Sequence, residues 1–112
     1  MKVNKDFSYK EVNLLSYNEF KKRCKFFFDC YADSNNYGFN FTNHYYCGEG
    51  SFSFSIFNYS ELDKDITIVQ NDYYQETCYK LYSRFGAKEK YIGDFITLTS
   101  ALNYIIANDL IK

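Results

Sequence analysis

The spacing of apolar residues changes along this chain, and that change limits the folds open to it. From Phe20 to Tyr31 apolar residues recur every three or four positions, as they do on one face of a helix. From Phe52 to Ile56 they alternate with serine, which is typical of a strand with one buried face. A helical period followed by a strand period in 112 residues predicts helices packed on a sheet, the α+β class.

The first predicted helix has a recognisable start. Ser16 and Glu19 have the spacing of a capping box, in which each side chain bonds a free amide of the first turn. We expect the helix to end near Asp33, before a run of turn-forming residues. Its buried face should hold Phe20, Cys24, Phe27, Phe28 and Tyr31.

A hairpin should follow, with strands from Phe39 to Cys47 and from Ser51 to Tyr59 joined by a glycine-containing turn at 48–50. The alternation in the second strand predicts that its serines, Ser51, Ser53 and Ser55, face water. Residues 63–65 read as another turn, and residues 66–70 as a third strand.

Residues 73–85 fit two patterns, an amphipathic helix and a strand favoured by Thr77, Tyr79 and Tyr82. We interpret Thr77 to Phe85 as a fourth strand. A last helix should run from Leu98 to Asp109, with Thr97 or Thr99 as its cap. The predicted fold is one domain over 1–112, a two-layer sandwich in which an antiparallel meander of about three or four strands is covered on one face by both helices.

Charge argues against a duplex-binding protein, because 13 basic residues are balanced by 14 acidic ones. Such proteins normally carry a clear basic excess that neutralises phosphates. One basic cluster still makes a nucleic-acid-binding accessory protein the alternative function. It consists of Lys21, Lys22, Arg23 and Lys25 on the first predicted helix.

Metal and thiol chemistry have weak support. Cys24, Cys30, His44 and Cys47 are four zinc-ligand types, but the first two lie six residues apart and would project roughly 120° apart on a helix. A Cys–His nucleophilic pair at His44 and Cys47 would fall on opposite faces of a strand. No phosphate-binding glycine motif is present. We therefore expect no cofactor, no metal and no catalytic residue.

Aromatic content points to a protein partner. The chain has 13 Tyr and 12 Phe, more ring surface than so small a core needs, and Tyr is enriched at recognition surfaces. Several tyrosines cluster near predicted turns. The partner-binding residues that we predict are Tyr45, Tyr46, Asp72, Tyr73 and Tyr74.

These patterns predict a small, non-enzymatic protein-binding module. The abundance of Lys, Asn, Ile, Tyr and Phe is typical of AT-rich genes, which suggests a phage or mobile-element factor. The expected partner is a host enzyme or a defence nuclease, as for an anti-CRISPR inhibitor, and a homodimer remains open. The N-terminal residues have no apolar run behind them, so we expect a cytoplasmic protein without a membrane contact.

Overall fold

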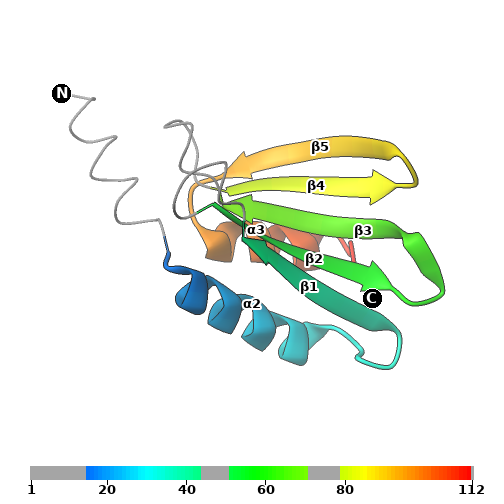
Figure 1. Cartoon of the computed structure of the whole chain (residues 1–112), viewed down its shortest axis with the longest axis horizontal. Coiled ribbons are helices and arrows are strands. Elements are labelled where there is room, and N and C mark those ends of the chain that lie inside the picture. The colour runs from blue at the N-terminus through cyan, green and yellow to red at the C-terminus, as the bar shows by residue number, and fades with distance from the viewer. Residues whose placement is uncertain (1–14, 44–50, 71–78, 112) are drawn as a thin grey trace.

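The computed structural model describes residues 15–43, 51–70 and 79–111, and within these ranges the chain forms one five-stranded antiparallel sheet and two helices. The strands follow one another across the sheet in chain order, so the sheet is a meander (Figure 1). The α+β class predicted from the sequence is confirmed. The elements are α2 (Tyr17–Tyr31), β1 (Tyr37–Asn43), β2 (Phe52–Asn58), β3 (Glu61–Gln70), β4 (Tyr79–Phe85), β5 (Lys88–Phe95) and α3 (Leu98–Ala107).

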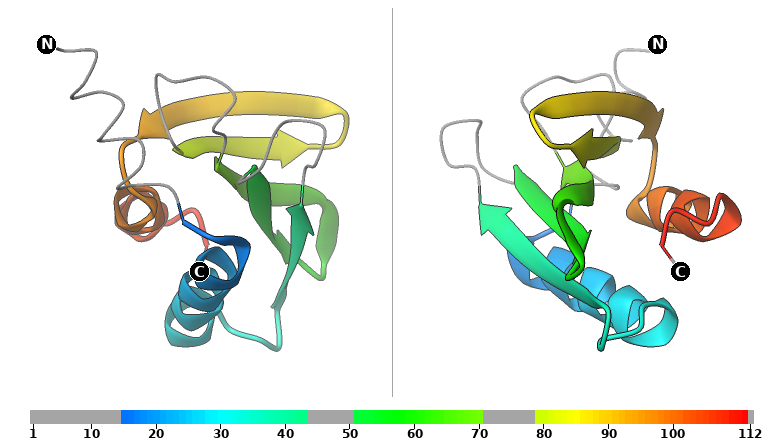
Figure 2. Two further views of the ribbon diagram at one scale, coloured as in Figure 1. Left: turned by 60° about the vertical axis from the view of Figure 1, so that its left-hand side comes forward. Right: turned by 90° about the vertical axis from the view of Figure 1, so that its right-hand side faces the viewer.

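The two helices pack on the same side of the sheet, which we call the inner face (Figure 2). α2 contacts β1 through the rings of Phe28 and Phe39, whose centroids are 4.7 Å apart. α3 lies against β4 and β5, where the rings of Tyr104 and Phe95 are 5.4 Å apart. The inner face carries Phe39 and Phe41 of β1, Phe52, Phe54 and Ile56 of β2, Ile66, Ile68 and Gln70 of β3, Tyr79 and Leu81 of β4, and Phe95 of β5.

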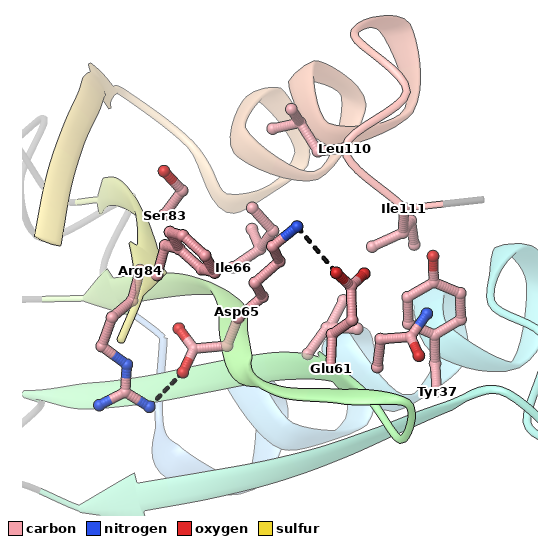
Figure 3. Close-up of a pocket in the computed structure, with 12 residues that line it drawn as sticks. Tyr37, Glu61, Asp65, Ile66, Ser83, Arg84, Leu110 and Ile111 are labelled. Atoms are coloured by element: carbon pink, nitrogen blue, oxygen red, sulfur yellow. Dashed lines mark hydrogen bonds and ion pairs between the residues drawn. The ribbon is translucent and has the colours of Figure 1, made fainter. Parts of the chain in front are cut away.

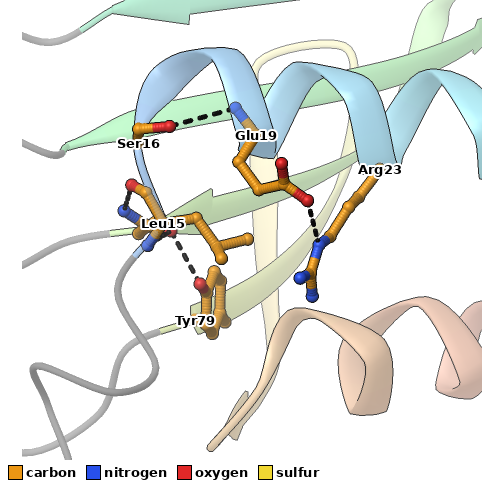
Figure 4. Close-up of polar contacts among 6 residues, drawn as sticks. Leu15, Ser16, Glu19, Arg23 and Tyr79 are labelled. Carbon is orange, nitrogen blue, oxygen red and sulfur yellow. Dashed lines mark hydrogen bonds and ion pairs between the residues drawn. The ribbon is translucent and has the colours of Figure 1, made fainter.

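The start of α2 is fixed by its cap and by a buried amide. Ser16 Oγ accepts a hydrogen bond from the Glu19 amide at 3.2 Å, so the predicted cap is confirmed (Figure 4). The second half of the predicted capping box is wrong, because the Glu19 carboxylate bonds Arg23 instead. Gln70 is fully buried, and its Oε1 and Nε2 bond the backbone N–H and C=O of Leu15 at 3.2 and 2.9 Å. Leu15, which precedes the cap of α2, is thereby tied to the central strand of the sheet.

The buried stripe of α2 is confirmed except at its last member. Phe20, Cys24, Phe27 and Phe28 are buried, whereas Tyr31 is 57% exposed. Tyr31 belongs to the last turn of the helix, where the chain leaves toward the β1 side of the sheet, so the core ends before this residue.

Residues 63–65 do not form the predicted turn, because they lie within β3. The turn comes earlier, at 59–60, where Asn58 Oδ1 accepts hydrogen bonds from the amide and the hydroxyl of Ser60 at 2.8 and 2.6 Å. The charged residues of 63–65 are accommodated in the strand by partners on β4. Asp65 pairs with Arg84, and Lys64 lies over the ring of Phe85.

The predicted wet serine face is wrong for two of its three members. Ser51 and Ser53 are buried, and Ser55 is half-buried. Strand β2 has a neighbour on each side, and Ser53 lies opposite Thr42 and Val69, whose longer side chains flank its hydroxyl. Ser55 bonds Thr67 across the sheet, with 2.8 Å between the two hydroxyl oxygens.

The prediction of three or four strands missed β5. Its sequence, KEKYIGDF, lacks the alternation of apolar and polar residues that marks a half-buried strand, because it lies at a margin of the sheet. The prediction of a strand instead of a helix is confirmed over 79–85. α3 is capped by Thr97, one of the two predicted residues, and ends two residues earlier than expected.

Several predicted features fall outside the described residues. They are the hairpin turn at 48–50, the end of the first predicted strand at 44–47 and the segment 71–78.

Candidate functional site

The residues predicted to bind a partner cannot be placed. Tyr45, Tyr46, Asp72, Tyr73 and Tyr74 all lie in 44–50 or 71–78, outside the described residues. Their role stays a prediction. The candidate surfaces below are therefore built from other residues.

Three residues of the basic cluster contact other side chains of α2. Arg23 Nε bonds Glu19 at 2.8 Å, and Lys25 Nζ bonds Asp29 at 2.8 Å, both four residues apart on the exposed surface. Lys21 lies over the ring of Tyr17, 4.4 Å from its centroid. Of the four residues, Lys22 alone has no hydrogen bond, ion pair or ring contact in the described chain. Two of the four cations that the sequence indicated are thus held in ion pairs within the helix.

One hollow of the described chain is a groove between the two helices, with a volume of about 420 Å³. We call it the interhelical groove. It is bounded on one side by α2 and on the other by the first turns of α3. The residues that line it are Lys22, Arg23, Phe26, Phe27, Tyr31, Thr99, Leu102 and Asn103.

Two aromatic side chains of the interhelical groove face solvent. Phe26 is 70% exposed and Tyr31 is 57% exposed, whereas Phe27 and Leu102 are buried beneath them. The rings of Phe27 and Tyr31 are 5.3 Å apart, so the exposed tyrosine rests on the core. Burial of a Phe side chain contributes about 1.5–3 kcal/mol, and Phe26 forgoes most of this in the isolated chain.

The sequence also indicates that the Phe26 ring is exposed, a point that the predicted buried stripe did not include. Phe26, Phe27 and Phe28 are consecutive, and successive residues of a helix project about 100° apart. Three consecutive rings cannot all face one core. Phe26 falls off the stripe set by Phe20 and Cys24, so an exposed ring at this position follows from the spacing. Leu102 and Asn103, by contrast, become part of a groove only through the packing of α3 beside α2.

A second hollow of about 270 Å³ lies near the turn between β2 and β3 (Figure 3). Leu110 and Ile111, which follow α3, bound one side, and Tyr37 lies at one end. Its charged residues are already paired. Lys64 Nζ is 2.9 Å from Glu61, an interaction that raises the pKa of the lysine, and Arg84 bonds Asp65, whose side chain is buried. Because each charge has a partner within the chain, this hollow is the weaker candidate for a binding site.

The face of the sheet opposite the helices, which we call the outer face, is held by polar pairs across its strands. Lys80 Nζ bonds Asp94 at 3.0 Å between β4 and β5, and Tyr91 donates a hydrogen bond to the same carboxylate. This hydrogen bond to an anion, with partial burial and the nearby negative charge, raises the pKa of Tyr91 to about 12. Partial burial acts to raise the pKa of Asp94, but the hydrogen bonds from Tyr91 and Lys80 outweigh it and hold that pKa below its usual value.

The cysteines of the described chain have different environments. Cys24 is buried in the core, where desolvation raises the pKa of its thiol well above the usual value, so it is a poor nucleophile. Cys30 is exposed on the last turn of α2. His44 and Cys47, which complete the zinc and nucleophile alternatives, lie outside the described residues. Within residues 15–43, 51–70 and 79–111 no three ligand-type side chains come together.

Comparison with known proteins gives no relative for this arrangement. No protein-family model, curated protein or solved structure matches the chain. Neither α2 nor α3 is both long enough and apolar enough to cross a lipid bilayer.

Proposed function

We propose that the chain is a non-enzymatic protein-binding module and that the interhelical groove is its contact surface. The observation that carries this proposal is the 70% exposure of Phe26 beside Tyr31, above a floor formed by Phe27 and Leu102. Exposed aromatic rings next to a buried apolar floor are typical of the anchor positions of protein interfaces.

The groove favours a helical segment of the partner. A channel between two helices accepts a third helix, which would place apolar side chains against Phe26, Phe27 and Leu102. Lys22 at the rim forms no hydrogen bond or ion pair in the described chain, although its charge acts on nearby Glu19, so an Asp or Glu beside the apolar anchors would complement it. We therefore propose an amphipathic helix with an acidic flank as the element bound.

The partner class comes from composition. A chain rich in Lys, Asn, Ile, Tyr and Phe suits a phage or mobile-element gene, and such factors act on proteins of their host. We propose a host enzyme or a defence nuclease as the protein inhibited. Tyr45, Tyr46, Asp72, Tyr73 and Tyr74 remain a second proposed contact surface.

Replacement of Phe26 tests the groove. Phe26→Ser should weaken binding of the purified partner by about 10- to 100-fold, the usual cost of removing an aromatic anchor. Leu62→Ser is the matched control, because Leu62 is 66% exposed but belongs to β3, away from the groove. The partner is first captured from a lysate of the native host, and affinities are then measured by calorimetry with both variants and with the wild type.

Equal affinity of Phe26→Ser and the wild type would contradict the groove as the contact surface. If alanine at Tyr45, Tyr46, Asp72, Tyr73 and Tyr74 abolished binding while Phe26→Ser did not, the contact would lie on the second surface. The alternative function, binding of nucleic acid by α2, predicts association with DNA or RNA that collapses as salt rises and weakens in Lys22→Ala. The ion pairs of Arg23 and Lys25 already argue against that alternative.

A further inference from the structure

Strand β1 forms one margin of the sheet, and in the described part of the chain no strand lies beyond it (Figure 1). It pairs with β2 in an unbroken register from Tyr37–Asn58 to Asn43–Phe52. A strand at a margin directs half of its backbone N–H and C=O groups away from its only neighbour. β1 is therefore a template onto which another strand can add.

Folded proteins usually protect such a margin with lysines, prolines, inward-pointing charges or bulges. β1 has none of these features. Its sequence is YGFNFTN, without a charged residue, and no bulge interrupts its pairing with β2. Lys25 lies near this margin, 6.0 Å from the centroid of the Phe39 ring, but it belongs to α2 and is already paired with Asp29.

We propose that β1 pairs antiparallel with β1 of a second copy of this chain. The two sheets would then form one continuous sheet around a two-fold axis, with the helices of both copies on the same side. Such an interface uses the same surface of each copy and closes on itself, as most homodimers do.

The strand is self-complementary in one register. Residues opposite each other in an antiparallel pair must share a face, so their numbers must add to an even sum. Of the registers allowed, the one centred on Asn40 pairs all seven residues of β1. It places Asn40 opposite itself, Phe39 opposite Phe41 of the second copy, and Gly38 opposite Thr42 of the second copy.

The inner face gains the most from this pairing. Phe39 and Phe41 are half-buried in the single chain and belong to a continuous set of rings, with Phe28 4.7 Å from Phe39 and Phe54 5.1 Å from Phe41. Two Phe39–Phe41 pairs across the axis would extend that set from one copy into the other. Aromatic pairs directly opposite each other across strands stabilise strand pairing.

On the outer face, no charged side chains of β1 would repel each other in the proposed dimer. Asn40 and Thr42 are exposed and uncharged, and an amide is both donor and acceptor, so two Asn40 side chains can bond each other across the axis. No like charges become opposed anywhere along the strand, which is the electrostatic condition for self-pairing.

This dimer does not depend on the proposed binding function. The interhelical groove lies on the side of α2 that carries Phe26 and Lys22, next to α3, whereas Lys25 of the same helix lies over β1. Pairing through β1 leaves the groove open in both copies, so the two proposals fail or succeed separately.

Charged substitutions of Asn40, which lies on the proposed two-fold axis, test the register. In the proposed dimer residue 40 faces itself, with about 4.5–5.5 Å between the two Cβ atoms. Asn40→Lys and Asn40→Asp should each be monomeric at concentrations where the wild type is a dimer, because each sets like charges against each other. An equimolar mixture of the two variants should recover the dimer. Oligomeric state is measured by sedimentation velocity, and circular dichroism checks that both variants are folded.

A wild-type protein that stays monomeric up to about 1 mM, a concentration that captures even weak complexes, would overturn the proposal. So would a dimer that persists unchanged in Asn40→Lys. A dimer lost in both variants but not recovered in the mixture would overturn the register centred on Asn40. The partner-binding assay of Phe26→Ser is unaffected by any of these results.

Discussion

Strand β1 crosses its margin of the sheet without a charged residue, whereas β5, at the opposite margin, carries Lys88, Glu89, Lys90 and Asp94. β1 keeps an unbroken register with its neighbour, while the pairing of β5 with β4 shifts between Leu81 and Tyr82. Charge and bulges are two of the features that protect a free strand edge. Within the described residues one margin of the sheet is therefore protected and the other is not, and this difference is the basis of the proposed dimer.

The glycines of the two margins also differ in how closely other side chains approach them. Substituting these glycines should give the largest change in stability. A Cβ at Gly38 of β1 would lie 2.7 Å from Phe57 Cζ and 2.8 Å from Tyr59 Oη, because the two rings cover this glycine on the outer face. A Cβ at Gly93 of β5 would meet its nearest atom, on the Phe95 ring, at 3.7 Å. A side chain at Gly38 must therefore displace the ends of two aromatic rings, whereas one at Gly93 fits without such a shift.

Alanine at each glycine turns this contrast into a measurement. Gly38→Ala should lower the free energy of unfolding by about 1–2 kcal/mol, because the Phe57 and Tyr59 rings must move. Gly93→Ala should stay within about 0.5 kcal/mol of the wild type or be slightly more stable, because it restricts the unfolded chain. Urea unfolding of both variants at one protein concentration checks the difference. Equal effects at the two sites would contradict the contrast between the margins.

Removal of the lysines of β5 should give a smaller effect on association. Lys88→Thr with Lys90→Thr, made in the Asn40→Lys background, removes two of the charges that protect this margin. We expect weak, concentration-dependent association where Asn40→Lys alone is monomeric. Lys22→Thr with Arg23→Thr in the same background changes the charge equally on α2 and should remain monomeric. Sedimentation velocity distinguishes the two, and identical behaviour would show that the lysines do not protect β5.

The smallest effect concerns the ion pair that joins β5 to β4. Asp94 has a pKa below its usual value, so its contribution to stability is present above about pH 4 and is lost as pH falls through the lowered pKa. Asp94→Asn should lower the free energy of unfolding at pH 7 by less than about 1 kcal/mol, because Lys80 and Asp94 are partly exposed. The difference from the wild type should vanish near pH 2. A difference independent of pH would mean that the charge of Asp94 does not stabilise this margin.

The elements that the sequence predicted best are those with a strict period. The stripe of α2 from Phe20 to Phe28 and the alternation around Phe54 located a helix and a central strand, because burial on one face imposes the period directly. β5 was missed for the opposite reason. A strand at a margin buries little, so residues such as Lys88 and Lys90 leave no apolar alternation to read.

The candidate site was less predictable than the fold. The consecutive rings at Phe26 to Phe28 implied one exposed ring, but the groove also needs Leu102, which lies far away in the chain and is brought near by the packing of α3. The number of free cations in the basic cluster was overestimated. The sequence analysis counted four cations, but two of them pair with Glu19 and Asp29, each one helical turn away. The spacing of apolar residues along the sequence does not show which side chains of separate segments come together.

Amide hydrogen exchange at two protein concentrations tests the difference between the margins most directly. At a concentration where the protein is dimeric, the outward-facing amides of β1, over Tyr37–Asn43, should exchange more slowly than in the dilute monomer. The amides of β5, over Lys88–Phe95, should exchange at the same rate in both samples. Protection that rises in β5 instead of β1, or that changes in neither strand as concentration increases, would contradict the account.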